Sequence, residues 1–136
     1  MKKLVSITLL SFVILSSTSC VDKNADSSDV KLVTADEMKK IIELEDVQLV
    51  DVRTPSEFDE IHIESAQNID FRSPTFEDDI TRLDKTKPVL LYCKSGKRSA
   101  KCARKLKEAG FEKVYELEGG ISKWQYSEIL TIEKKS

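Results

Sequence analysis

The stretch VLLYCKSGKRSA, residues 89–100, joins an apolar run to a segment with one cysteine, three cations and a glycine. The run Val89-Leu90-Leu91-Tyr92 has no polar break, as expected of a strand buried on both faces of a parallel sheet. Beyond the polar segment, apolar side chains recur at helical spacing, and a glycine follows where a helix C-terminus favours positive φ: Cys102, Ala103, Leu106, Ala109 and then Gly110. The stretch therefore predicts a strand, a loop and a helix in succession.

Strand and helix patterns alternate along the rest of the chain. Further strands are predicted at 31–33, 47–50, 66–69 and 113–117, and helical segments at 34–44, 56–59, 75–83 and 121–129. The first helix begins with the capping-box pair Thr34 and Glu37. It should turn four apolar side chains toward the core, namely Met38, Ile41, Ile42 and Leu44. This alternation predicts an α/β fold, an open parallel β-sheet flanked by helices on both faces.

The size and composition of the chain are those of one globular domain. Its 136 residues are 40% hydrophobic and 34% charged, which is enough for one core and unlike a disordered chain. Residues 1–19 hold two of the 22 basic residues and no acid, so the remainder has 20 basic and 24 acidic residues, a net charge of −4. Nucleic-acid-binding proteins usually carry an excess of Lys and Arg. No nucleic-acid partner is predicted, and any cationic site must be local.

The N-terminal residues have the order of an export signal. Met1-Lys2-Lys3 is basic, residues 4–15 are mostly apolar, and residues 16–19 are small. The apolar part, about 12 residues, is shorter than the ~20 that a membrane-spanning helix needs. Cys20 follows in a context that resembles the processing site of bacterial lipoproteins, although Ser17 departs from that pattern. A plain signal peptide cut near Ser19 is the alternative.

These patterns divide the chain into four parts. We predict a signal peptide at 1–19, a lipid-anchored tether at 20–29 with Cys20 as the lipidated residue, a folded domain at 30–129 and a C-terminal tail at 130–136. The tether is rich in Asp, Ser and Asn and has little to bury. The protein is therefore expected to be exported to the cell envelope. There a lipid would anchor it to a bacterial membrane, facing the periplasm or the exterior.

The loop after the apolar run is predicted to place a reactive thiolate beside an anion site. In an open parallel sheet, ligands bind at the carboxyl ends of the strands, where Cys93 lies. The unpaired N–H groups of the following helix, its dipole and the nearby cations should lower the pKa of Cys93. Gly96 lets the loop curl so that several N–H groups converge on one point. A loop of solvated lysines with an incidental cysteine is the alternative.

Three stretches, in order along the chain, resemble the signature motifs of the rhodanese-like domain family. They are LVDVRTPSEFDEIHI (49–63), YCKSGKRSA (92–100) and VYELEGGISKW (114–124). The resemblance extends from about residue 30 to about residue 127. Two positions depart from the family's pattern, because Ile61 and Ser65 stand where glycines are usual. These departures affect a local turn and leave the cysteine loop intact.

The resemblance implies a sulfurtransferase. Cys93 would accept a sulfur atom as a persulfide, and five residues would bind the sulfane sulfur or the anionic donor: Lys94, Ser95, Gly96, Lys97 and Arg98. Asp51 and Arg53, which match the family's Asp-Val-Arg, would support the loop as a structural ion pair. A small anionic donor such as thiosulfate would supply the sulfur. A thiophilic acceptor, a small thiol or a protein, would then remove it.

Two other functions remain open from the sequence. One is a persulfide carrier or redox-sensing module that serves a protein partner. The other is a phosphatase or arsenate reductase, whose loop in this fold is one residue longer and wide enough for a tetrahedral oxyanion. The six residues 93–98 are a better fit to a single terminal sulfur, which favours sulfur transfer.

The remaining chemically versatile side chains are predicted to be structural. Cys102 lies on the apolar stripe of its helix, so we expect it in the core, with a resolving thiol for Cys93 as the alternative. His62 is the only histidine, and the proposed mechanism needs no base. With one histidine and no clustered cysteines, neither a metal site nor a cofactor is predicted.

Overall fold

A five-stranded parallel sheet forms the centre of the protein. The computed structural model describes residues 30–125 and 127–135. The sheet has the strand order β1-β6-β5-β2-β4, and every neighbouring pair is parallel. Its strands are β1 (Lys31–Val33), β2 (Gln48–Asp51), β4 (Gln67–Asn68), β5 (Val89–Tyr92) and β6 (Val114–Leu117). A separate antiparallel pair joins β3 (Ile61–Ile63) to β7 (Ile132–Lys134).

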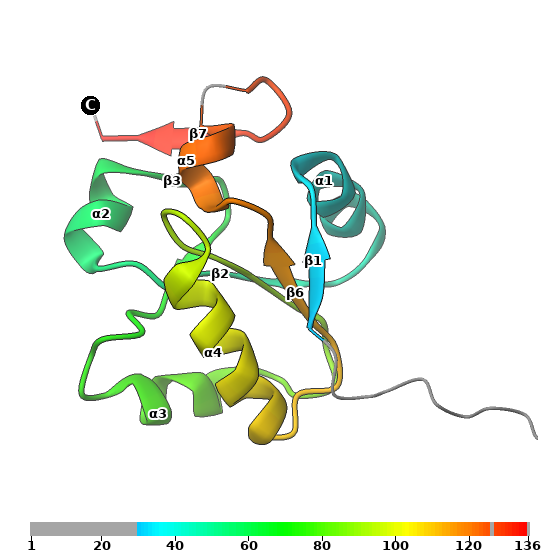
Figure 1. The fold of residues 1–136 in the computed structure, drawn as a ribbon, viewed down its shortest axis with the longest axis vertical. Coiled ribbons are helices and arrows are strands. Elements are labelled where there is room, and N and C mark those ends of the chain that lie inside the picture. Colours follow the sequence, from blue (N-terminus) through cyan, green and yellow to red (C-terminus); the bar gives the residue numbers. More distant parts are fainter. Residues whose placement is uncertain (1–29, 126, 136) are drawn as a thin grey trace, which may run out of the picture.

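Helices cover both faces of the sheet (Figure 1). They are α1 (Ala35–Leu44), α2 (Pro55–Glu60), α3 (Phe76–Asp79), α4 (Lys97–Glu108) and α5 (Gly120–Trp124), with a 3₁₀ turn η1 (Ile80–Arg82) directly after α3. The predicted fold class, an open parallel sheet with helices on both faces, is confirmed. Parallel strands need long crossover connections, and the helices supply them.

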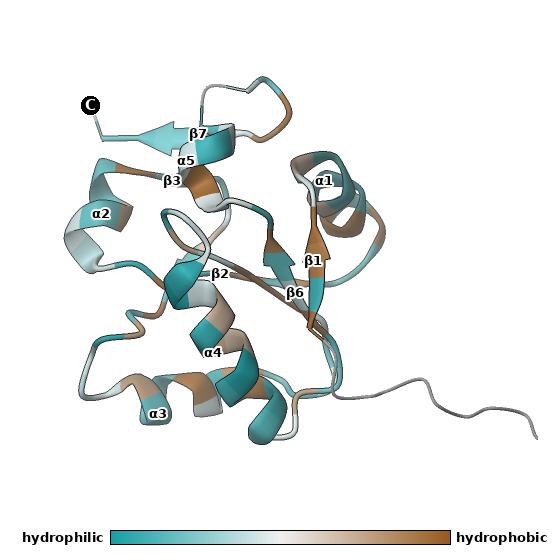
Figure 2. Cartoon of the chain, in the orientation of Figure 1, coloured by the Kyte–Doolittle hydropathy of each residue, from teal (hydrophilic) through white to brown (hydrophobic). Residues whose placement is uncertain are grey.

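The strand residues alternate between two cores, one on each face of the sheet. Val89 and Leu91 face the core that α3 and α4 cover, together with Phe76 and Leu106. Leu90 and Tyr92 face the core covered by α1 and α5. All four residues of β5 are fully buried, as its uninterrupted apolar run predicts. Hydrophobic residues are accordingly frequent in the central strands (Figure 2).

Helix α1 begins as predicted but turns its apolar residues differently. The Thr34 hydroxyl accepts a hydrogen bond from the Glu37 N–H, and the Glu37 carboxylate accepts one from the Thr34 N–H, which confirms the capping box. The prediction that Ile42 and Leu44 face the core is wrong, because they are 36% and 83% exposed. At about 100° per residue, Leu44 lies about half a turn around the helix from the buried Ala35.

The end of the chain also differs from the sequence prediction. Helix α5 ends at Trp124, whereas a helix was predicted to continue to residue 129. The Trp124 indole N–H donates to the Glu118 carbonyl at 2.8 Å, which holds the helix end against the loop before it. Residues 132–134 form β7, and Leu130 is buried, so packing continues beyond residue 129 into the segment predicted to be a tail.

The predicted signal peptide, the tether and the lipidated Cys20 lie outside the described residues, and they stay predictions. Within the described residues, no helix combines the length and the apolar character needed to cross a bilayer.

Candidate active site

The cysteine loop lies at the carboxyl end of the central strand. Strand β5 ends at Tyr92 and α4 begins at Lys97, so residues 93–96 connect them. Because β5 pairs with β6 on one side and β2 on the other, this connection leaves the middle of the sheet edge (Figure 1). Ligands of open α/β sheets bind at such an edge. The structure therefore places Cys93 where the sequence analysis expects it.

Hydrogen-bond donors surround the Cys93 sulfur. Sγ accepts a hydrogen bond from the Gly96 N–H at 3.1 Å and lies 3.5 Å from the Ser99 hydroxyl. Burial alone would raise the pKa of the Cys93 thiol. Hydrogen bonds from the hydroxyl and N–H of Ser99 and from the N–H groups of Ser95 and Gly96 outweigh burial, so the pKa lies below its usual value. A lowered pKa raises the thiolate fraction, and the thiolate is the nucleophilic form.

Gly96 gives the loop its shape. It is the N-cap of α4 and adopts φ +95°, a left-handed conformation that favours glycine. No side chain caps this helix end. The first N–H groups of α4 are therefore free to point at the sulfur, and the helix dipole adds its positive end there.

Helix α5 holds the loop from the other side. The Ile121 N–H donates to the Cys93 carbonyl at 2.9 Å, and the Ser122 N–H donates to the Lys94 carbonyl at 3.1 Å. The Ser122 hydroxyl donates to that same carbonyl at 2.6 Å. A Cβ on Gly120 would lie 2.5 Å from the Lys94 carbonyl group, so only glycine permits this approach. The Gly-Gly step before α5 thus sets the position of the loop backbone.

Arg98 has a partner that the sequence analysis did not anticipate. Its guanidinium donates two hydrogen bonds to the Glu57 carboxylate, at 2.7 and 2.8 Å. Glu57 also completes the capping box of α2 with Thr54. The Arg98 hydrogen bond, assisted by the Thr54 N–H, lowers the pKa of Glu57 to about 2 in spite of partial burial. The first turn of α4 is thereby fastened to the first turn of α2.

The ion pair of Glu57 and Arg98 predicts an acid-dependent loss of stability. The folded pKa of Glu57, about 2, lies below its ordinary value of 4.5, so its contribution is complete above about pH 5 and disappears as the pH falls from 4.5 to 2. Glu57→Gln is expected to lower the free energy of unfolding by roughly 1–2 kcal/mol at pH 7, a value reduced by solvent screening. Urea unfolding at pH 7, 4 and 2 measures this.

The matched control for this prediction is Glu77→Gln. Glu77 pairs with Lys105, but its side chain is 65% exposed. Its loss should change stability by less than about 0.5 kcal/mol at any pH, because exposed ion pairs contribute little. A Glu57→Gln effect that is equally large at pH 2 and pH 7 would contradict the assigned ionisation.

The Asp51–Arg53 pair lies inside the protein at the end of β2. Asp51 is fully buried and Arg53 is 3% exposed. The guanidinium donates to the carboxylate at 2.7 and 3.0 Å, and the Arg53 N–H donates to it at 2.9 Å. Arg53 also donates to the Ile61 carbonyl, and the Asn68 amide donates to the Arg53 carbonyl at 2.9 Å. These contacts join β2 to the segments that carry β3 and β4.

The remaining predicted residues divide between exposed and buried positions. Lys94, Ser95 and Lys97 are exposed, so both ammonium groups can reach an anion in solution. Cys102 is a free thiol, 1% exposed, and burial raises its pKa to about 12, which makes it a poor nucleophile. His62 contacts the Phe58 carbonyl at 2.8 Å and the Glu133 carboxylate at 3.0 Å, linking β3 to β7.

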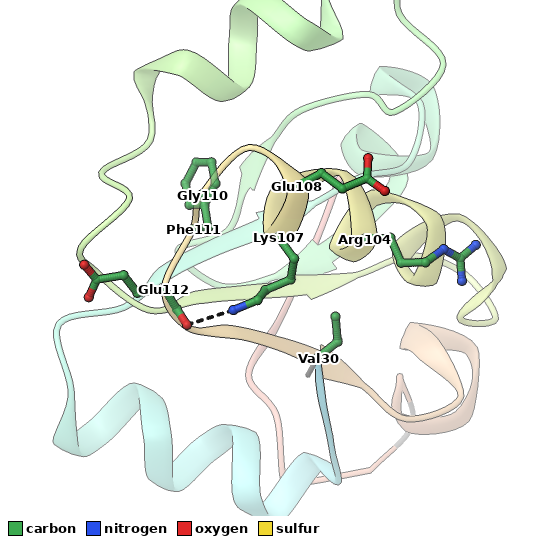
Figure 3. Close-up of a pocket in the computed structure, with 7 residues that line it drawn as sticks. All are labelled: Val30, Arg104, Lys107, Glu108, Gly110, Phe111 and Glu112. Carbon is green, nitrogen blue, oxygen red and sulfur yellow. Dashed lines mark hydrogen bonds between the residues drawn. The ribbon is translucent and has the colours of Figure 1, made fainter. Parts of the chain in front are cut away.

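Two other features of the described residues carry no part of this chemistry. In that part of the chain, no group of three or more His, Cys, Asp and Glu side chains is placed to hold a metal ion. A hollow of about 640 Å³ opens at the opposite end of α4 from the loop (Figure 3). Its lining includes Val30, Arg104 and Phe111, and Lys107 donates there to the Glu112 carbonyl at 3.0 Å. Cys93 is not among its lining residues.

Fold and site together define a small parallel α/β domain with an activated cysteine at a strand–helix junction. The family model described as "Rhodanese-like domain" matches residues 34–127. The chain belongs to the rhodanese-like domain family.

Three similar proteins match different shares of the chain. The chain is 42% identical over 77 residues to "Uncharacterized protein YqhL" of Bacillus subtilis, covering 57% of this chain and 60% of that protein. It is 40% identical over 76 residues to "Probable adenylyltransferase/sulfurtransferase MoeZ" of Mycobacterium tuberculosis, covering 56% of this chain but 19% of MoeZ. It is 32% identical over 97 residues to "Thiosulfate sulfurtransferase GlpE" of Shewanella oneidensis, covering 71% and 94%. The chain therefore spans less than two thirds of YqhL and MoeZ.

A solved structure agrees with the fold. The rhodanese-like domain protein from Staphylococcus aureus superposes with a TM-score of 0.66 at 33% identity, covering 79% of this chain and all of that one. The relatives named as sulfurtransferases support the sulfurtransferase family in the broad sense, and this structure supports the rhodanese-like fold.

Proposed function

We propose that the protein is a thiosulfate-type sulfurtransferase that works through a persulfide on Cys93. The observation that supports this most directly is the buried sulfur with the Gly96 N–H at 3.1 Å and the Ser99 hydroxyl at 3.5 Å. Such a group of donors stabilises both the thiolate and the anionic outer sulfur of a persulfide. The similarity to a protein named thiosulfate sulfurtransferase supports the same class of reaction.

The proposed reaction has two steps. The Cys93 thiolate attacks the outer sulfur of thiosulfate, a bond forms between Sγ and that sulfur, and the sulfur–sulfur bond of thiosulfate breaks. Sulfite leaves with the electron pair of the broken bond. A thiophilic acceptor then attacks the outer sulfur and regenerates the thiolate, so cyanide would leave as thiocyanate. The kinetics should be ping-pong, because a covalent intermediate separates the two substrates.

The exposed cations fit the first step. Lys94 and Lys97 are on the loop and accessible to solvent. They would draw a doubly charged donor toward the sulfur. Arg98 is paired with the Glu57 carboxylate at 2.7 Å, so it would serve mainly to keep the loop in place.

A persulfide carrier that serves a protein partner is the second candidate. Cys93 is only 1% exposed, which favours an acceptor shaped to reach it over a freely diffusing one. The relative MoeZ is named as both a probable adenylyltransferase and a sulfurtransferase, and the match covers 19% of it. A carrier would load sulfur through the same loop but release it slowly to small acceptors.

Mass spectrometry of the purified, reduced protein tests the proposal. After brief incubation with thiosulfate, the wild type and Cys102→Ala are expected to gain about 32 Da, and Cys93→Ala to gain nothing. Peptide mapping should place the added sulfur on Cys93. Cyanide should then remove it with release of thiocyanate.

The outcomes separate the candidates. Fast release of thiocyanate supports the enzyme, and slow release with retained loading supports the carrier. If the wild type gains no mass while Cys93 still reacts with iodoacetamide, sulfur transfer from thiosulfate is rejected. Hydrolysis of an oxyanion ester by the same thiolate would then be the function to assay.

A further inference from the structure

A buried glutamate lies behind the cysteine loop, and the proposed reaction gives it no role. Glu116 is in β6 and is only 7% exposed. Glu116 is two residues after Val114 in the strand, so both side chains face α4. The strand pattern would place an apolar residue at this buried position. An ionisable group in such a place is costly unless it is paired.

Ser99 connects this glutamate to the sulfur of Cys93. The Ser99 hydroxyl lies 2.7 Å from the Glu116 carboxylate, 3.2 Å from the Gly96 carbonyl and 3.5 Å from the Cys93 Sγ. Ser99 itself is fully buried. A hydroxyl has one proton to donate. Three acceptors therefore compete for that proton, and the shortest contact is with Glu116.

The protonation state of Glu116 decides which acceptor receives the hydrogen bond from the Ser99 hydroxyl. An ionised Glu116 can only accept, so the Ser99 hydroxyl donates its hydrogen bond to the carboxylate and an oxygen lone pair faces the sulfur. A protonated Glu116 can donate to the Ser99 oxygen, which leaves the Ser99 hydroxyl free to donate to Sγ, because a thiolate is a stronger acceptor than the neutral Gly96 carbonyl. The second arrangement adds the Ser99 hydroxyl to the N–H donors that stabilise the Cys93 thiolate, whereas the first leaves only the N–H donors to do so.

The surroundings of Glu116 favour its protonated form more than water does. Burial raises its pKa, while the Ser99 hydrogen bond and the charge of Arg104 lower it, and the net shift is upward. Arg104 is the charged side chain of α4 that acts on it. The Cys102 thiol, also on α4, has a pKa of about 12 and stays neutral. The strand neighbours Leu32 and Leu91 carry no charge.

We propose that Glu116 is a positioning residue that tunes the reactivity of Cys93 through the direction of the Ser99 hydroxyl. This inference rests on the proposed role of Cys93 as the nucleophile. It adds that sulfur transfer has a second pH dependence, set by a carboxyl that touches neither donor nor acceptor.

The test measures iodoacetamide alkylation of Cys93 against pH, read at the Cys93 peptide by mass spectrometry. Glu116→Gln removes the charge and supplies an amide N–H that can donate to the Ser99 oxygen at every pH, which leaves the Ser99 hydroxyl free to donate to Sγ. The midpoint of the pH profile is expected to fall by about one unit. Because thiolate nucleophilicity decreases with pKa along a slope of about 0.4–0.5, the rate should rise about threefold at neutral pH and drop about threefold on the alkaline plateau.

Ser99→Ala separates the effect that Glu116 transmits through the Ser99 hydroxyl from a direct effect of its charge. Removing the Glu116 charge would also lower the pKa of Cys93 slightly through space, whether or not Ser99 is present. In the Ser99→Ala background, Glu116→Gln is expected to leave the midpoint within about 0.2 units, since no hydroxyl remains to transmit the change. A shift of similar size in both backgrounds would overturn the proposal.

The two proposals fail in different ways. Alkylation reports the thiolate and needs no sulfur donor. If the protein forms no persulfide but shows the Ser99-dependent shift, the proposed function is rejected and the role of Glu116 is supported. If a persulfide forms but the alkylation midpoint is the same in all variants, the proposed function is supported and the role of Glu116 is rejected. Thermal unfolding confirms that each variant is folded, and if Ser99→Ala is not, Ser99→Gly takes its place with the same expectation.

Discussion

Gly120→Ala is expected to reduce thiocyanate formation by at least about 100-fold and the free energy of unfolding by roughly 3 kcal/mol. The new methyl group would lie 2.5 Å from the Lys94 carbonyl carbon and oxygen and 2.6 Å from the Cys93 carbonyl oxygen. These are backbone atoms and cannot rotate away. The loop must shift by a large part of an ångström, which moves the donors off Sγ. Steady-state kinetics and urea unfolding measure the two effects.

Gly110→Ala is the matched control. Gly110 has φ +91°, at least as unfavourable for alanine as Gly120 at +64°, but a Cβ there meets nothing within 4 Å. Its replacement should lower stability by only about 1 kcal/mol and leave the reaction rate unchanged. Equal losses of activity in both variants would mean that positive φ alone, rather than contact with the loop, explains the effect.

Removing one partner of the Asp51–Arg53 pair is expected to be the second severe change. Arg53→Met would leave the carboxylate of Asp51 fully buried without its cation. Breaking such a pair typically lowers stability by about 3–5 kcal/mol. It would also leave the Ile61 carbonyl without the Arg53 donor. Urea unfolding at pH 7 gives the free energy directly.

The double variant Asp51→Asn/Arg53→Met tests the cause. Without a buried charge, it should recover roughly half of the loss, while the amide keeps the hydrogen bond to the residue 53 N–H that Asp51 accepts at 2.9 Å. If the double variant is as unstable as Arg53→Met, the stability was lost with the packing of the arginine side chain and not through the unpaired buried charge of Asp51. Activity per folded molecule should change little in either variant, because the pair supports the scaffold.

The fold could be predicted where a local pattern has one physical solution. The unbroken apolar run of β5 requires burial on both faces, and the Thr34–Glu37 spacing matches one helix start. The exposure of Leu44 could not be predicted in this way. Its hydrophobicity suggests burial, but the angle of a helix on its sheet decides which side of the last turn is covered. Likewise β7 has no strong pattern of its own, and it exists because β3 is there to pair with it.

The site could be predicted only in its local part. Cys93, Gly96 and the start of α4 follow one another in the sequence, so the thiolate and its N–H donors could be predicted. Glu57 is 41 residues away from Arg98, and Glu116 is 17 from Ser99. Such partners meet only through the order of the strands. Gly120 belongs to a recognised motif, but its function as a contact surface for residue 94 needs the folded backbone.

The attachment of the loop to α5 has a consequence for the order in which the site is assembled during synthesis. The carbonyls of Cys93 and Lys94 find their partners in Ile121 and Ser122, almost thirty residues later in the chain. Until those residues have been synthesised, the two carbonyls lack these partners and the loop is not held from that side. The final position of the cysteine loop is therefore set late, by a short helix that contains no reacting group.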